Sequence, residues 1–211
     1  MKRSVFSATT RADSVGVMSR AARSEPRYTS REYFDLVERG LLDADDRVEL
    51  LEGVIVAMSP QSPRHASAIH RIEDVLRRAL GERALVWGQS PLIAGDYSVP
   101  EPDVMVLPGS ISDYEDAHPT MTLLVVEVAD TSLKQDRLTK SAIYAAAGIP
   151  EYWIVNLRDD CVEVARVPAP EESRYLQNFT ARRGEQIELA TLPGTFVAVD
   201  ALFPGHVMST E

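Results

Sequence analysis

Two carboxylates occupy positions in the sequence where an acid is unusual. Glu127 lies inside the apolar run 123–129, and Asp103 stands at the head of a second apolar run, 104–107. Short, unbroken apolar runs are typical of strands that are covered on both faces of a sheet. An unpaired, ionised carboxylate in such a strand costs several kcal/mol or more, so Glu127 must be protonated, paired or bound to a cation.

A helix predicted over 132–147 supplies a third charged group. Thr131 or Ser132 can serve as its N-cap, and Gly148 follows its last residue. Residues four apart lie on the same face of a helix. One face of this helix therefore carries three polar side chains: Asp136, Lys140 and Tyr144.

These groups have a chemistry in common. Asp103 and Glu127 offer hard oxygen ligands of the kind that Mg²⁺ or Mn²⁺ prefers, and Lys140 can stabilise a developing negative charge. Two alternatives need no metal. Glu127 and Lys140 can form a buried ion pair, or Lys140 can pair with Asp136 on a surface helix for only about 0.3–0.5 kcal/mol.

Composition limits the class of protein. A chain of 211 residues with 45% hydrophobic and 26% charged residues is ordinary for one soluble domain. The single Cys161 excludes an internal disulfide and suits a cytoplasmic, bacterial location, and no apolar run is long enough for a membrane span. Residues 1–27 have no apolar periodicity and are expected to be a disordered leader before one domain over 28–211, with Met18 as an alternative start.

The remaining pattern predicts an α/β (α+β) fold, a mixed sheet flanked by helices, with a parallel crossover through the helix 132–147. A capping box at Thr29 to Glu32 opens a helix, and Glu52-Gly53 forms the turn of a hairpin. We expect helices over 29–39, 64–80 and 132–147, a loop over 109–120, and strands at 48–51, 54–58, 84–87, 90–93, 103–107, 123–129, 151–155, 161–166, 175–179, 186–189 and 196–199.

Several familiar sites are missing from the sequence. The four histidines lack zinc-ligand spacing, and there is no P-loop, dinucleotide-binding glycine pattern or Gly-x-Ser-x-Gly elbow. Cys161 has the pattern of a buried structural cysteine. His65, in the first turn of the helix 64–80, is either a contact to phosphate or metal or a capping or solvated histidine.

A series of short motifs runs through the sequence in a fixed order, at residues 49–53, 58–60, 102–103, 126–128, 136–144, 148–155 and 192–194. Through these motifs the sequence resembles, over residues 28–203, the Uma2 (DUF820) family of predicted endonucleases in the PD-(D/E)XK nuclease superfamily. The resemblance implies a restriction-endonuclease-like core and divalent-metal-dependent hydrolysis of DNA.

The family's motif can be matched residue by residue. Asp103 takes the place of its first acid and Glu127 of its second, whereas Ala129 stands where the motif has its lysine. The resemblance implies that a lysine on the next helix replaces it, and Lys140 stands at that position. Glu49 matches a further acid, and Glu52 matches less closely.

The hypothesis is therefore a metal-dependent DNA endonuclease that uses Mg²⁺ or Mn²⁺. The residues expected to act directly are Asp103, Glu127 and Lys140, with Asp103 and Glu127 as the metal ligands, and the supporting residues are Glu49, Asp136, Tyr144 and His65.

The alternative is a nuclease fold that no longer cuts and serves as a nucleic-acid-binding or protein-interaction module. The formal charge of −10 favours this alternative, because phosphate-binding surfaces are normally basic. No membrane partner is expected, and cutting both strands of DNA would favour a two-fold homodimer.

Overall fold

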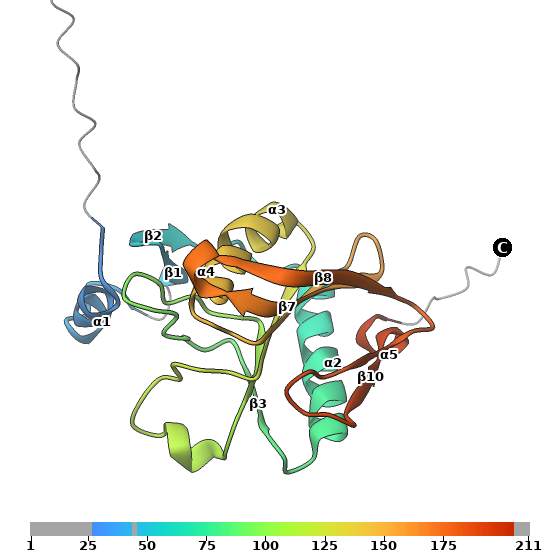
Figure 1. The fold of residues 1–211 in the computed structure, drawn as a ribbon. Coiled ribbons are helices and arrows are strands. Elements are labelled where there is room, and N and C mark those ends of the chain that lie inside the picture. The colour runs from blue at the N-terminus through green and yellow to red at the C-terminus, as the bar shows by residue number, and fades with distance from the viewer. Residues whose placement is uncertain (1–26, 44–45, 205–211) are drawn as a thin grey trace, which may run out of the picture.

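A six-stranded mixed sheet forms the centre of the protein in a computed structural model, which describes residues 27–43 and 46–204 (Figure 1). The strand order is β3-β4-β5-β6-β7-β8, and β5 and β6 are parallel while the other neighbouring pairs are antiparallel. The predicted mixed sheet with a parallel crossover is therefore confirmed. The strands are β3 (Leu85–Gly88), β4 (Val104–Leu107), β5 (Leu124–Ala129), β6 (Glu151–Asn156), β7 (Cys161–Ala169) and β8 (Arg174–Arg182).

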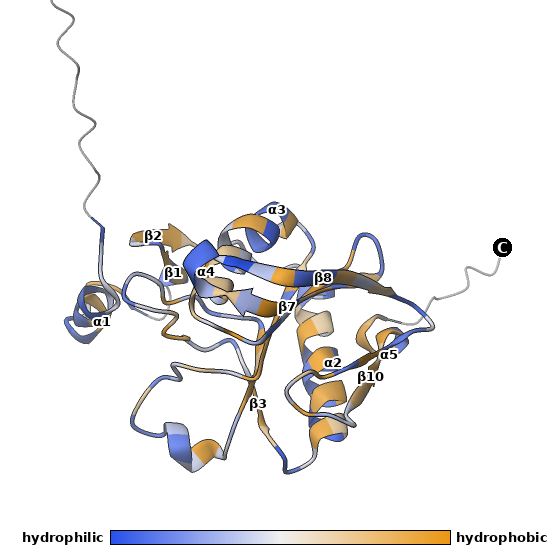
Figure 2. Cartoon of the chain, in the orientation of Figure 1, coloured by the Kyte–Doolittle hydropathy of each residue, from blue (hydrophilic) through white to orange (hydrophobic). Residues whose placement is uncertain are grey.

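Helices cover both faces of this sheet. The helix α2 (Pro63–Leu80) packs on one face together with α5 (Val199–Leu202). Figure 2 shows hydrophobic residues along α2 beside α5 and β10 (Phe196–Ala198). The opposite face packs against α4 (Ser141–Ala146). Because both faces are covered, all six residues of β5 are buried, Glu127 among them.

The predicted helix 132–147 contains a π-helical turn, which the sequence pattern did not reveal. It is divided into α3 (Leu133–Gln135), the π-helical turn η3 (Asp136–Lys140) and α4. Ser132 occupies the N-cap position, as one of the two expected caps, but its hydroxyl donates to Oδ2 of Asp136 and makes no capping hydrogen bond. Single π-turns are rare and occur frequently at functional sites.

A smaller hairpin and an N-terminal helix lie beside the main sheet. The capping box at Thr29 is present at the start of α1 (Ser30–Glu38), and the hairpin turns at Glu52 and Gly53, both with positive φ. A backbone bridge between Leu50 and Val99 ties the hairpin to the segment before β4. The hairpin strands are β1 (Val48–Leu51) and β2 (Val54–Ala57).

The predicted strand 90–93 is wrong. Pro91 has no N–H to donate to a ladder, and the N–H groups of Leu92 and Ile93 donate to Pro100 and Pro119 in an irregular segment. Within the predicted loop 109–120 lies a short 3₁₀ turn, η2 (Ile111–Tyr114).

The C-terminal part of the sheet also differs in detail from the prediction. β8 is an edge strand and is longer than the strand predicted at 175–179. The other two expected strands pair with each other in a separate sheet instead of joining the main one. The strands of this separate sheet are β9 (Gln186–Glu188) and β10 (Phe196–Ala198). A short 3₁₀ turn, η4 (Pro170–Glu172), connects β7 to β8.

The predicted leader lies outside the described residues except for Arg27. Its guanidinium donates to the carbonyl oxygen of Glu52 and lies over the ring of Tyr97. Within residues 27–43 and 46–204, no helix has both the length and the apolar character needed to cross a bilayer.

Candidate active site

The register of β4 and β5 brings the two predicted acids together. Val104 lies opposite Val126 in this antiparallel pair, so the next position along places Asp103 opposite Glu127. Both side chains fall on the sheet face that packs against α4, because side chains alternate between faces along a strand. Oδ2 of Asp103 also accepts the N–H of Val128 at 2.8 Å, which fixes the carboxylate at the end of β4.

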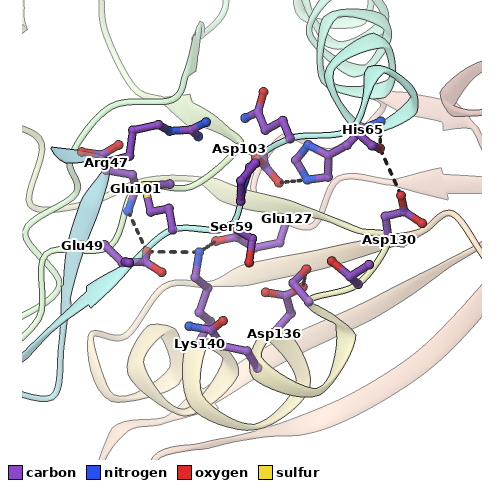
Figure 3. A pocket seen from close by; sticks show the side chains of 18 residues that line it. Arg47, Glu49, Ser59, His65, Glu101, Asp103, Glu127, Asp130, Asp136 and Lys140 are labelled. Carbon is purple, nitrogen blue, oxygen red and sulfur yellow. Dashed lines mark hydrogen bonds and ion pairs between the residues drawn. The ribbon is translucent and has the colours of Figure 1, made fainter. Parts of the chain in front are cut away.

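Lys140 points from η3 into the space between two acids. Its Nζ lies 3.0 Å from Oε1 of Glu127 and 3.2 Å from Oε2 of Glu49, and all three side chains are buried (Figure 3). Burial alone would lower the pKa of Lys140, but the charges of Glu127 and Glu49 raise it, so the amine is charged. The buried ion pair considered from the sequence is present, with Glu49 as a second partner.

Burial acts on the acids in the opposite direction. It raises the pKa of Glu127 well above its usual value, and the neighbouring Lys140 ammonium opposes this shift. The hydroxyl of Tyr144 donates to Oε1 of Glu127 at 2.6 Å, and burial raises the pKa of the phenol, which keeps it protonated as a donor. Tyr144 therefore contacts Glu127 from the protein interior and does not line the cavity.

Asp136 is buried beside this group without contacting Lys140. Its Oδ2 accepts the Ser132 hydroxyl at 2.6 Å, and no ion pair within 4.0 Å joins it to Lys140 in the described chain. Burial raises the pKa of Asp136 to about 6, although Ser132 and Lys140 partly oppose the shift. The surface pairing of Asp136 with Lys140 considered from the sequence is thus wrong.

His65 approaches Asp103 from the first turn of α2. Its Nε2 lies 3.4 Å from Oδ2 of Asp103. Burial lowers the pKa of His65. The hydrogen bond and charge of Asp103 and the charge of Asp130 raise this pKa by more than burial lowers it, so the net shift is upward. Nδ1 of His65 is buried and has no hydrogen-bond partner within the described residues.

Apart from Tyr144, these side chains line one cavity of about 150 Å³ (Figure 3). Two of its acids were not selected from the sequence. Glu101 donates its backbone N–H to Glu49, and Asp130 follows β5 directly and accepts from the Ser62 hydroxyl. An acid immediately after a buried strand was a usable clue for Asp130. The charged residues of the lining are Arg47, Glu49, His65, Glu101, Asp103, Glu127, Asp130, Asp136 and Lys140.

The carboxylate oxygens of Asp103 and Glu127 are ligands of the type that a divalent cation such as Mg²⁺ prefers. Asp103 and Glu127 face one cavity, and the hydrogen bonds and ion pairs among the described residues use Oδ2 and Oε1 but not Oδ1 of Asp103 or Oε2 of Glu127. Mg²⁺ typically takes one or two carboxylates and keeps several waters. Among residues 27–43 and 46–204, no group of three or more His, Cys, Asp or Glu side chains is placed to hold a metal ion, so water or substrate would complete the ligand shell.

The fold defines the class of protein to which this site belongs. The structure resembles a crystal structure from Anabaena variabilis described as "a putative nuclease belonging to DUF820", with a TM-score of 0.65 and 16% sequence identity over 83% of this chain and 97% of the other. A family model, Uma2, described as "Putative restriction endonuclease", matches residues 31–200. The chain belongs to the Uma2 family, as the motifs predict. A comparison with curated proteins gave no match.

The raised pKa of Asp136 predicts a pH-dependent effect of Asp136→Asn. The folded state binds this proton more tightly than the unfolded state, so the carboxyl reduces stability as pH rises from about 4 to about 6. A shift of about two pKa units corresponds to about 3 kcal/mol at most. We expect Asp136→Asn to unfold at a higher urea concentration than wild type at pH 8, with little difference at pH 4.

The matched control is Asp35→Asn, which removes an exposed carboxylate from α1. It should show no such change in urea midpoint between pH 4 and pH 8. A pH-independent difference between Asp136→Asn and wild type would contradict the raised pKa of Asp136.

Proposed function

We propose that this protein is a divalent-metal-dependent nuclease that hydrolyses phosphodiester bonds in DNA. One observation carries the proposal: Asp103 and Glu127 lie opposite each other on neighbouring strands, and the ammonium of Lys140 is 3.0 Å from Glu127 in the same cavity. Membership of a family described as "Putative restriction endonuclease" supports the reaction class.

In this proposal Asp103, Glu127 and Lys140 have different roles. Asp103 and Glu127 would hold the metal ion through the oxygens that their hydrogen bonds leave unused. When bound, Mg²⁺ or Mn²⁺ supplies a Lewis acid for the phosphoryl oxygen and lowers the pKa of bound water. Lys140 fixes the orientation of Glu127 and brings positive charge to a largely acidic cavity, where negative charge develops on the phosphate.

The supporting residues hold this arrangement in place. Glu49 anchors the other side of the Lys140 ammonium, and Tyr144 orients Glu127 from the interior. His65 lies against Asp103 at the rim, where it can donate a hydrogen bond to the same carboxylate or to a phosphate oxygen. We expect the protein to act in the bacterial cytoplasm, and cleavage of both strands would favour two such sites in a two-fold dimer.

A cleavage assay tests the proposal. Wild-type protein is incubated with plasmid, single-stranded DNA and branched DNA in Mg²⁺, Mn²⁺ or EDTA. We expect cutting of at least one substrate with either metal and none in EDTA. The absence of cutting with every substrate and metal, or cutting that persists in EDTA, would contradict the proposed reaction.

Metal binding should also be visible without any substrate. A ligand that binds only the folded state raises its stability by about 2.7 kcal/mol at one hundred times its dissociation constant. We therefore expect Mn²⁺ to raise the melting temperature of wild type and to have a smaller effect on Asp103→Asn. An equal response of the two proteins would favour the alternative of a fold without a metal site, a binding module that no longer cuts.

A further inference from the structure

A second, larger hollow opens directly beside the acidic cavity. It has a volume of about 510 Å³, within the roughly 300–1,000 Å³ range of small-molecule sites. The two hollows share part of their walls, so they lie side by side. The shared residues are Arg47, Met58, Gln61 and Glu101.

Aromatic rings line part of this hollow, whereas charged side chains line the acidic cavity. The rings of Phe34 and His118 stack with their centroids 5.0 Å apart and their planes 11° apart, and Tyr33 meets Phe34 edge to face. Phe34 is half-buried and His118 is exposed, and both rings line the hollow, where a further flat ring can pack against them. Stacked aromatic faces are the usual binding surface for unpaired nucleobases.

Two polar residues of the same wall have strained backbones. Arg47 and Gln89 both line the hollow with positive φ, at 38° and 48°, which is uncommon for residues other than glycine. The Gln89 N–H donates to the carbonyl oxygens of Pro102 and Asp103, which ties this wall to the strand that carries the first acid. Strained, non-glycine backbone is concentrated at ligand sites.

The charge of the protein also indicates what kind of nucleic acid can bind. The chain has a formal charge of −10, and the acidic cavity holds six Asp and Glu side chains against Arg47 and Lys140 as its fully charged bases. Affinity for a regular duplex comes largely from lysine and arginine contacts with phosphates. Stacking on an aromatic side chain does not depend on positive charge and contributes about 5- to 150-fold in affinity for each base.

We propose that the Phe34–His118 hollow binds an unpaired nucleobase next to the phosphate that is cleaved. The substrate would then be a single strand, or a strand that is locally unpaired at the cut site, in preference to continuous duplex. This inference rests on the proposed nuclease function and adds its substrate class. In regular duplex every base is paired and stacked within the helix, so none can enter the hollow without being extruded.

Binding measurements can test this separately from cleavage. The Asp103→Asn protein, which should not cut, is titrated in Mg²⁺ into labelled single-stranded DNA, RNA of the same sequence, duplex, and a DNA strand with abasic sites, and fluorescence anisotropy is recorded. We expect the single strand to bind at least about fivefold more tightly than duplex or abasic DNA. The DNA and RNA titrations determine which backbone is accepted.

Substitution of the aromatic wall completes the test. In the same background, Phe34→Leu keeps an apolar side chain but loses the aromatic face, and Phe196→Leu makes the same change at an exposed site on β10. We expect Phe34→Leu to weaken single-strand binding by about 5- to 150-fold while leaving abasic binding unchanged, and Phe196→Leu to change neither. Melting curves check that both variants are folded.

The outcomes separate the two proposals. Equal binding of duplex and single strand, equal effects of the two leucine substitutions, or no binding of any nucleic acid would overturn the nucleobase site. The expected binding pattern together with a wild-type protein that never cuts would leave this inference in place and overturn the proposed nuclease activity.

Discussion

Lys140→Met should lower the free energy of unfolding by about 3–5 kcal/mol at pH 8. The substitution removes a buried ammonium that lies within 3.2 Å of two buried carboxylates, Glu127 and Glu49. Both acids would then remain buried without their counter-charge. Because protonation of the acids relieves this penalty, the loss should become smaller as pH falls towards 4. Urea unfolding at pH 8 and pH 4 measures the effect.

The control for this prediction is Lys134→Met, which makes the same change at an exposed position of α3. It should unfold close to wild type at either pH. Adding Glu127→Gln to Lys140→Met should recover part of the lost stability, since one stranded charge is removed. If Lys140→Met and Lys134→Met unfold at the same urea concentration, Lys140 is not held as an ion pair between the two acids.

Asp103→Asn and Glu127→Gln should each reduce metal-dependent cleavage by about 10³-fold or more. Loss of a carboxylate ligand removes several kcal/mol of transition-state stabilisation, and each 1.36 kcal/mol is a factor of about ten in rate. Single-turnover cleavage rates in Mg²⁺ and Mn²⁺ measure this loss. Asp116→Asn and Glu115→Gln, which alter exposed acids in the loop after η2, are the matched controls and should cut at the wild-type rate.

The free energy of unfolding of the same variants shows whether the substituted residue acts in cleavage or only stabilises the fold. Glu127→Gln does not strand Lys140, because Glu49 remains 3.2 Å from the ammonium. It also removes a carboxylate whose pKa is raised by burial. The apo protein should therefore stay within about 1 kcal/mol of wild type, as is common for active-site substitutions. A folded Glu127→Gln protein that cuts at the wild-type rate would exclude Glu127 as a metal ligand.

Sequence reasoning selects several of the charged residues that line the candidate cavity and misses others. Glu127 and Asp103 could be selected because acids at buried strands need a partner, and Lys140 because of its spacing on the next helix. Unbroken apolar runs predict buried strands, and β4, β5 and β6 lie at three such runs. These features are local in sequence, and local patterns are what composition and periodicity reveal.

Features that depend on distant contacts could not be found in this way. Glu49 reaches Lys140 because the β1–β2 hairpin is tied to the segment before β4 through Leu50 and Val99. From the sequence, only the family resemblance selected Glu49. The Phe34–His118 stack joins residues from α1 and the loop before β5, with no periodicity to connect them. The failed strand at 90–93 reflects an apolar pattern overridden by Pro91.

The π-turn at η3 is a place where this helix can lose a residue. Such a turn holds one residue more than an α-helical turn. Deleting Leu138, which is 61% exposed, would let the segment close into a regular α-helix, and the residues on either side would keep nearly the same direction about the helix axis. A deletion within a regular α-helix instead rotates everything that follows by about 100°. In a library of single-residue deletions, loss of Leu138 should therefore be tolerated better in a selection for soluble protein than loss of Arg71, an exposed residue of α2.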